Sequence, residues 1–149
     1  MNIPTKNTEL ETVAKVLIVD SLKNALILTV GEHRERPEKS FRPDLPGGLV
    51  EEGEFEKDAA IRETMEEAGI PLNPNDVHLA YAKTQYYEDE NKSTTKFLYT
   101  CVIDEAPEIT LSWEHSAYEW VPLDTLLETV TFRSFYKEAI EYSLTNNLV

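Results

Sequence analysis

The sequence is poor in cysteine and in long apolar runs, and each shortage excludes a class of protein. Cys101 is the only cysteine, so no disulfide can form within the chain, and a reducing compartment such as the cytoplasm is expected. Its apolar, strand-like surroundings predict a packed core thiol. No segment approaches the roughly 20 apolar residues that a membrane-spanning helix needs. The first residues also lack the apolar core of a signal peptide, so we expect a cytoplasmic protein without a membrane partner.

Positive charge is also scarce. The chain has 14 lysines and arginines against 28 aspartates and glutamates, which gives a formal net charge of −14. Binding to a DNA or RNA duplex requires a basic surface, so a nucleic-acid duplex is not an expected partner. A small polyphosphate is still compatible with this charge, because divalent cations can lie between phosphates and carboxylates.

The length of 149 residues suits a single domain with a real core, and no internal repeat or linker divides it. We therefore predict one domain over residues 1–149. The apolar patterns predict strands at 12–20, 25–30, 77–87, 94–103 and 118–121, and helices at 55–68, from 122 to about 128, and at 131–144. Strands 12–20 and 25–30 are predicted to form one hairpin, and strands 77–87 and 94–103 a second one. The order favours an α/β fold with a mixed sheet between helices.

Three acids of the helix predicted at 55–68 are unusually placed. Glu63, Glu66 and Glu67 stand at i, i+3 and i+4, so they would share one helix face. Like charges at this spacing repel by roughly 0.2–0.5 kcal/mol per pair. Because a bound cation would offset this repulsion, three such acids after a Gly-Gly turn indicate a cation site. On these three residues alone, an ordinary solvated helix face is the alternative.

The rest of this helix has its own predicted roles. Ile61, Met65 and Ala68 fall opposite the acids and are predicted to pack on a sheet. Ala59 and Ala60 are predicted to flank the acidic stripe and to leave room beside it. Gly69, followed by Pro71, is predicted to cap the helix C-terminus.

Residues 48–70 follow the pattern G-x5-E-x7-R-E-U-x-E-E-x-G-U, in which U is a bulky apolar residue. The matching positions are Gly48, Glu54, Arg62, Glu63, Glu66, Glu67, Gly69 and Ile70. Thr64 departs from it at the first U position, and its hydroxyl is predicted to bond a backbone carbonyl one turn back. This run resembles the Nudix hydrolase signature. The resemblance implies a Nudix-type α/β/α sandwich with a mixed β-sheet between helices.

The resemblance also implies a metal site. It makes Glu63, Glu66 and Glu67 metal ligands, with the Gly47 carbonyl as a fourth. Oxygen ligands of this kind suit Mg²⁺, with Mn²⁺ as a possible substitute.

Arg62 and Glu54 resemble the pair that orients the catalytic helix and loop in this family. The alternative is local, because Asp58 and Glu66 lie four residues to either side of Arg62 and would form ordinary helix ion pairs with it.

The implied reaction is attack of a metal-activated water on a phosphorus atom of a nucleoside diphosphate that is linked to another group. Glu66 or Glu114, in the loop at 112–117, would act as the general base. A small-molecule nucleotide is the implied partner, and a homodimer is a possibility at the level of the family. A non-catalytic nucleotide sensor on the same fold is the main alternative. An isoprenoid diphosphate isomerase is a second one, but it would require a catalytic cysteine, and Cys101 lies in a predicted strand.

The substrate is not encoded in the signature. Tyr86 and Tyr87 follow the signature by 16 and 17 residues, where a tyrosine resembles the diadenosine polyphosphate branch of the family. His33, His78 and His115 lack metal-ligand spacing and are interpreted as surface histidines or as histidines with internal partners. The long loop at 31–44 carries four cations that could reach a phosphate, namely Arg34, Arg36, Lys39 and Arg42.

Overall fold

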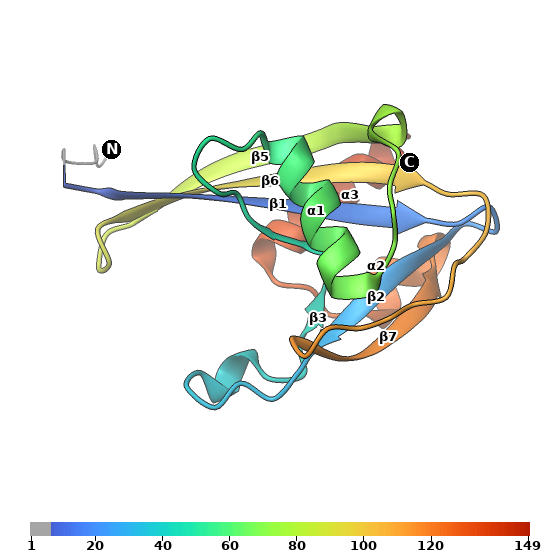
Figure 1. Cartoon of the computed structure of the whole chain (residues 1–149), viewed down its shortest axis with the longest axis horizontal. Helices are drawn as coiled ribbons and strands as arrows, with labels where there is room; N and C mark the ends of the chain where they lie inside the picture. Colours follow the sequence, from blue (N-terminus) through green and yellow to red (C-terminus); the bar gives the residue numbers. More distant parts are fainter. Residues whose placement is uncertain (1–6) are drawn as a thin grey trace.

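A computed structural model describes residues 7–149 and contains a seven-stranded mixed sheet between helices (Figure 1). The strands are β1 (Glu9–Val19), β2 (Asn24–Val30), β3 (Pro43–Asp44), β4 (Gly47–Leu49), β5 (Val77–Tyr87), β6 (Lys92–Val102) and β7 (His115–Pro122). The helices are α1 (Glu56–Ala68), α2 (Leu126–Thr129) and α3 (Ser134–Thr145), with short 3-10 turns at Pro37–Lys39, Pro74–Asp76 and Leu123–Thr125. No helix of the described part of the chain is long and apolar enough to cross a membrane.

The centre of the sheet is β1, which is covered on both faces. Val16 and Ile18 point into the apolar cluster under α1, whereas Leu17 and Val19 point into the cluster under α2 and α3. Since a strand covered on both faces gains from apolar side chains at every position, its sequence reads as a continuous apolar run. In Figure 1, α1 lies in front of the sheet and α3 behind it. The predicted α/β/α sandwich is therefore confirmed.

The first predicted hairpin is correct only at its turn. Among the described residues, β1 and β2 share the single antiparallel pair Val19↔Ala25. Beyond that pair the two strands diverge, because β4 occupies the edge of β1 that a longer hairpin would use. β1 instead pairs in parallel with β6 from Glu9↔Lys92 to Val19↔Val102, and β2 pairs with β7. The second hairpin, β5 with β6, is confirmed.

Helix α1 packs on the sheet through Ile61 and Ala68 as predicted, but Ala59 and Ala60 take the place predicted for Met65. Ala59, Ala60 and Ala68 are completely buried against the sheet, so the first two do not flank an open stripe. Met65 was expected in the core but is 53% exposed. Small alanine side chains let the helix axis approach β1 and β4 closely, and this rotates Met65 outward. Thr64 is buried as well, and its hydroxyl donates to the Ala60 carbonyl at 2.7 Å, as predicted.

The ends of several elements also differ from the predictions. Gly69 has a left-handed backbone (φ 70°) and its N–H donates to the Met65 carbonyl, which confirms the predicted cap. β7 begins at His115, three residues before the predicted start, and α3 begins at Ser134 instead of 131. The loop at 31–44 contains a 3-10 turn and the short β3. Cys101 is 2% exposed, so the predicted core thiol is confirmed.

Candidate active site

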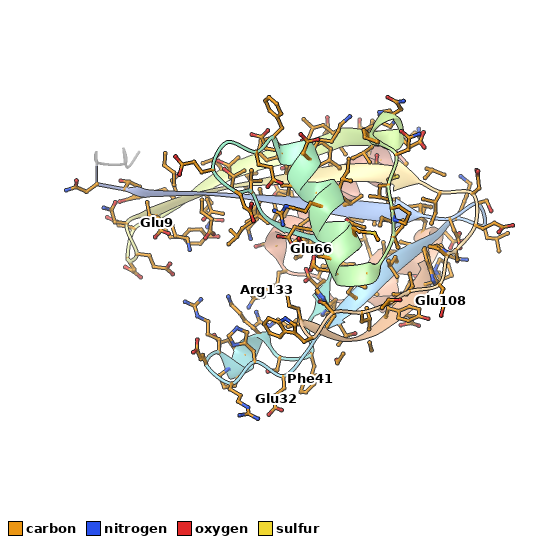
Figure 2. All side chains as sticks on the ribbon, viewed as in Figure 1. Glu9, Glu32, Phe41, Glu66, Glu108 and Arg133 are labelled. Carbon is orange, nitrogen blue, oxygen red and sulfur yellow. The ribbon has the colours of Figure 1, made fainter. Side chains whose placement is uncertain are left out.

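The three acids of α1 occupy three different environments. Glu66 projects from the outer side of the helix, and 59% of its side chain is exposed (Figure 2). The Glu63 side chain is mostly covered, and Glu67 is 2% exposed. The three acids on one face of α1 therefore range from the exposed Glu66 to the buried Glu67.

Two glycines bring β4 against these acids. The Gly47 N–H donates to Glu67 Oε1 at 2.8 Å. A Cβ at Gly47 would lie 2.1 Å from the Ala14 carbonyl oxygen, and Gly47 has a positive φ of 129°, so only glycine fits. A Cβ at Gly48 would lie 2.8 Å from Glu63 Cδ. The second glycine thus leaves the space in which the Glu63 carboxylate lies.

Arg62 connects the helix to the loop that precedes it. Its Nε and Nη2 donate to the two oxygens of Glu54 at 2.8 and 3.0 Å, and Nη2 also donates to the Leu49 carbonyl. Its Nη1 reaches Glu63 Oε1 at 3.1 Å and Glu66 Oε2 at 3.2 Å. These bonds from Arg62 lower the pKa of Glu54 to about 2. The structure thus brings Arg62 and Glu54 together and places them against two of the acids; Asp58, the other local candidate, is not among the partners of Arg62 that the described structure contains.

Burial and neighbouring charge both act on Glu63. Its pKa is raised, chiefly by burial, and the negative charges of Glu66 and Glu114 add to this effect while Arg62 opposes it. The exposed Glu114 belongs to a loop beside α1, because the Ser112 N–H donates to the Glu67 carbonyl. Its loop is held in place by a bond from the Gly31 N–H to the Glu114 carbonyl. Concentrated carboxylate charge of this kind suits a bound divalent cation.

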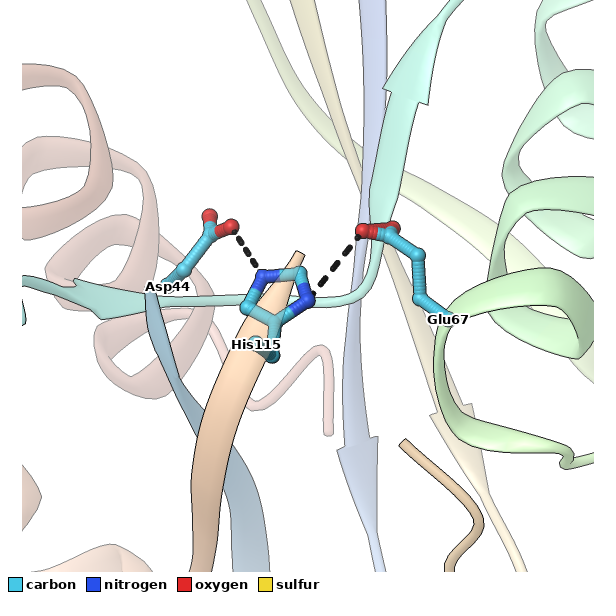
Figure 3. A group of neighbouring side chains, drawn as sticks. All are labelled: Asp44, Glu67 and His115. Carbon is cyan, nitrogen blue, oxygen red and sulfur yellow. Dashed lines mark hydrogen bonds and ion pairs between the residues drawn. The ribbon is translucent and has the colours of Figure 1, made fainter. Parts of the chain in front are cut away.

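Behind Glu67 lies a buried group that the sequence did not predict (Figure 3). His115 stands between two carboxylates, with Nε2 2.8 Å from Asp44 Oδ2 and Nδ1 3.7 Å from Glu67 Oε2. Burial raises the pKa of Glu67 to about 7, although Lys15 opposes the shift. Ligand atoms of Asp44, Glu67 and His115 lie within 4.8 Å of one another, a spacing that could hold a metal ion.

Lys15 completes this group from β1. Its Nζ donates to Asp44 Oδ1 and to the Leu45 carbonyl at 3.1 Å each, and to the Gly47 carbonyl at 2.9 Å. Burial alone would lower the pKa of Lys15, but the nearby Asp44, Tyr136 and Glu67 raise it overall, so the group is an ammonium ion. In the sequence, this group is indicated only by Lys15, a charged residue within an apolar strand. His115 gave no such signal, because its partners come from distant segments.

The face of the sheet on the α3 side carries a pocket of about 360 Å³ next to Lys15. Arg42 Nη1 is buried there without a hydrogen-bond partner among the described residues. Lys96 lies over the Phe135 ring, and its pKa is lowered by burial and then by the charge of Lys15. Two carboxylates line the pocket against six cations, which are Lys15, Lys39, Arg42, Lys83, Lys96 and Arg133.

Of the loop cations that sequence analysis singled out, Lys39 and Arg42 line this pocket, whereas Arg34 and Arg36 are not among its lining residues. Tyr87 also lines it, and the Tyr86 hydroxyl donates instead to Asn91 at the β5–β6 turn. In a protein with a net charge of −14, six cations are thus gathered on the face of the sheet opposite α1.

The family model of the NUDIX domain matches residues 10–142. The chain belongs to this family. Over 89 residues it is 36% identical to the asymmetrical bis(5'-nucleosyl)-tetraphosphatase of Sus scrofa, a match that covers 59% of this chain and 60% of the relative. The chain thus spans about 60% of the length of this curated relative.

Solved structures of NUDIX proteins have the same fold. A MutT protein from Methanosarcina mazei Go1 aligns with a TM-score of 0.77 at 23% identity, covering 95% of this chain and 99% of that one. An Ap4A hydrolase from C. elegans aligns with a TM-score of 0.63 at 24% identity, covering 91% and 97%. At these identities the likeness extends to the fold and no further.

Proposed function

We propose that this NUDIX chain is a Mg²⁺-dependent hydrolase that cleaves dinucleoside polyphosphates into two unequal nucleotides. The observation that carries the proposal is a hydrogen-bonded link between the acidic helix and the basic pocket. Lys15 lines the pocket and donates to the Gly47 carbonyl, while the Gly47 N–H donates to Glu67. In this proposal, a phosphate chain extends from the pocket past this link toward the acids of α1.

The donor set fits a hard divalent cation. Glu63, Glu66 and Glu67 offer carboxylate oxygens, and Gly48 leaves the Glu63 carboxylate free of a Cβ clash. A cation bound there would lower the pKa of a water and offset the charge that grows on the phosphoryl oxygens. Mn²⁺ prefers similar ligands and is expected to substitute.

The residues of the chain have separate tasks in this proposal. Arg42, Lys96 and their neighbours hold the phosphates by charge-assisted hydrogen bonds, and Tyr87 lies where a nucleobase could stack. Arg62 and Glu54 orient the helix. Glu66 or Glu114 accepts the proton of the water as a new P–O bond forms and the bridging P–O bond breaks, and the leaving phosphate departs with the bridging oxygen.

The choice of substrate rests on two features. Four curated relatives at 31–36% identity are, by their names, bis(5'-nucleosyl)-tetraphosphatases. The pocket also gathers six cations against two carboxylates, which suits a chain of several phosphates. The homodimer and the cytoplasmic location stay predictions.

A substrate panel tests the proposal. Diadenosine tetraphosphate, dATP, ADP-ribose and a nucleotide sugar would each be incubated with the protein and Mg²⁺, and the products separated by chromatography. We expect diadenosine tetraphosphate to be the best substrate and to give ATP and AMP. Glu67→Gln should reduce its turnover by at least about 100-fold, since a charge-stabilising group is lost. Glu52→Gln changes an exposed acid within the signature that has no role in the proposal, and it should keep the wild-type rate. Binding without turnover would favour the nucleotide sensor instead.

A further inference from the structure

The Gly47 carbonyl, which the family resemblance makes a metal ligand, already has a cationic partner in this chain. Lys15 and Gly47 are directly opposite each other in the β1–β4 pairing, so the lysine lies beside the carbonyl by virtue of the sheet register. The Lys15 ammonium donates to Gly47 O at 2.9 Å. This contact is therefore built into the backbone and does not depend on a flexible loop.

All three N–H bonds of the ammonium have acceptors. Besides Gly47 O, they are the Leu45 carbonyl and Asp44 Oδ1, both at 3.1 Å. Asp44 is itself held by His115 Nε2 and by the Tyr136 hydroxyl, at 2.8 and 2.9 Å. Only 11% of the Lys15 side chain is exposed, so the group has little freedom to turn away. A cation fixed in this way contributes a permanent positive charge beside Glu67.

A metal ion on the same carbonyl would be repelled by this charge. Magnesium binds oxygen at about 2.0–2.1 Å, so an ion on Gly47 O would lie within about 5 Å of the ammonium. The two cations would share a buried site in which charges are weakly screened. Glu63 and Glu66 have no contact with Lys15 in the described structure; Arg62 bonds to both, and 59% of the Glu66 side chain stays exposed.

We propose that the Lys15 ammonium replaces one divalent cation of this site, so that metal ions bind toward Glu63 and Glu66 without the Gly47 carbonyl. The inference rests on the proposed metal-dependent function. It states that one side chain, Lys15, takes the place of one metal ion. It makes Lys15 a positioning residue that holds the β4 turn and supplies positive charge to a substrate phosphate.

The number of Mn²⁺ ions bound per chain tests this without any turnover. Free Mn²⁺ would be measured by electron paramagnetic resonance during a titration of the wild type and of Lys15→Met, which has a similar shape without the charge. We expect Lys15→Met to bind one more Mn²⁺ per chain than the wild type. An unchanged number would overturn the proposal.

Two further variants identify the source of an extra ion. The double variant Lys15→Met/Asp44→Asn keeps the local net charge and frees Gly47 O, and it should also bind one more ion. If the gain disappears in the double variant, the extra ion had bound to the unpaired Asp44, and the proposal is wrong. Lys92→Met removes a half-buried strand lysine that pairs with Glu11 and Glu90, and it should bind as many ions as the wild type.

The wild-type protein gives an independent check that needs no variant. Anomalous scattering from crystals with Mn²⁺ should place no ion within coordination distance of Gly47 O, and an ion there would overturn the proposal. Failure of the proposed function has a different signature. If the metal site on which that function depends is absent, the wild type would bind no Mn²⁺ and Glu63→Gln would not alter its titration; if only the substrate is wrong, the ion counts would stand and the substrate panel would show it.

Discussion

Gly47 has a backbone conformation that requires glycine, and its backbone also contacts Lys15 and Glu67. Its positive φ and its close approach to Ala14 both require glycine. Gly47→Ala should therefore destabilise the protein by at least about 2 kcal/mol in urea unfolding. Gly53 provides a matched control, because it also has a positive φ (79°) but an added methyl group there would have no neighbour within 4 Å. Gly53→Ala should cost about 1 kcal/mol. Equal costs at the two positions would mean that the contact with β1 is unimportant.

Cys101 makes stability depend on pH in the alkaline range. Burial raises the pKa of its thiol from 9.0 to about 11. The folded state therefore favours the neutral thiol, and this contribution is complete below pH 9 and is lost as the pH rises from 9 to 11. The loss amounts to roughly 2–3 kcal/mol. The Tm of the wild type should thus fall further between pH 8 and pH 10.5 than that of Cys101→Ala. Parallel Tm profiles would contradict this assignment.

At the scale of elements, α1 and the loop before it are joined through one side chain. Arg62 contacts Glu54 through two nitrogens and also reaches the Leu49 carbonyl on β4. Because the same guanidinium contacts Glu63 and Glu66, the position of the loop and that of the acids are coupled. A planar fork with several donors is needed for this, and a lysine cannot supply it.

Arg62→Lys should therefore lower turnover by about 10–100-fold through misplacement of the acids. Amide exchange in residues 50–55 should accelerate at the same time, as measured by mass spectrometry. Lys57→Met serves as the control, since Lys57 lies on the same helix and donates to the Pro74 carbonyl on the far side of the site. Wild-type exchange and turnover in Arg62→Lys would refute the coupling.

Local sequence patterns predicted most of the helices and strands, but not all of the strand pairings. β5 has the predicted bounds, because its apolar and aromatic residues are framed by an aspartate-containing turn and a polar turn. The divergence of β1 from β2 could not be predicted, since it depends on β4, three residues long, which reads as a turn in the sequence. The exposure of Met65 was missed for a similar reason. The packing of α1 is decided by alanines, whose small size carries a weak periodic signal.

At the scale of the whole molecule, charge is divided between the two sides of the sheet. The acids of the NUDIX signature lie on the α1 side, whereas six cations gather in the pocket on the α3 side. A net charge of −14 conceals this division, because it averages over both faces. Spacing within one helix predicted the acids. The group of Lys15, Asp44 and His115 joins β1, β3 and β7, and such a meeting of distant segments has no local sequence pattern.

The parallel pairing of β1 with β6 has a consequence for the order of folding. Residues 9–19 align with residues 92–102, so more than 80 residues separate the two strands in the sequence. Closing so large a loop is entropically costly and slows folding. During synthesis, all residues of α1 are added long before residue 102 leaves the ribosome. The acids of α1 are therefore synthesised well before the sheet that gives them different environments can close.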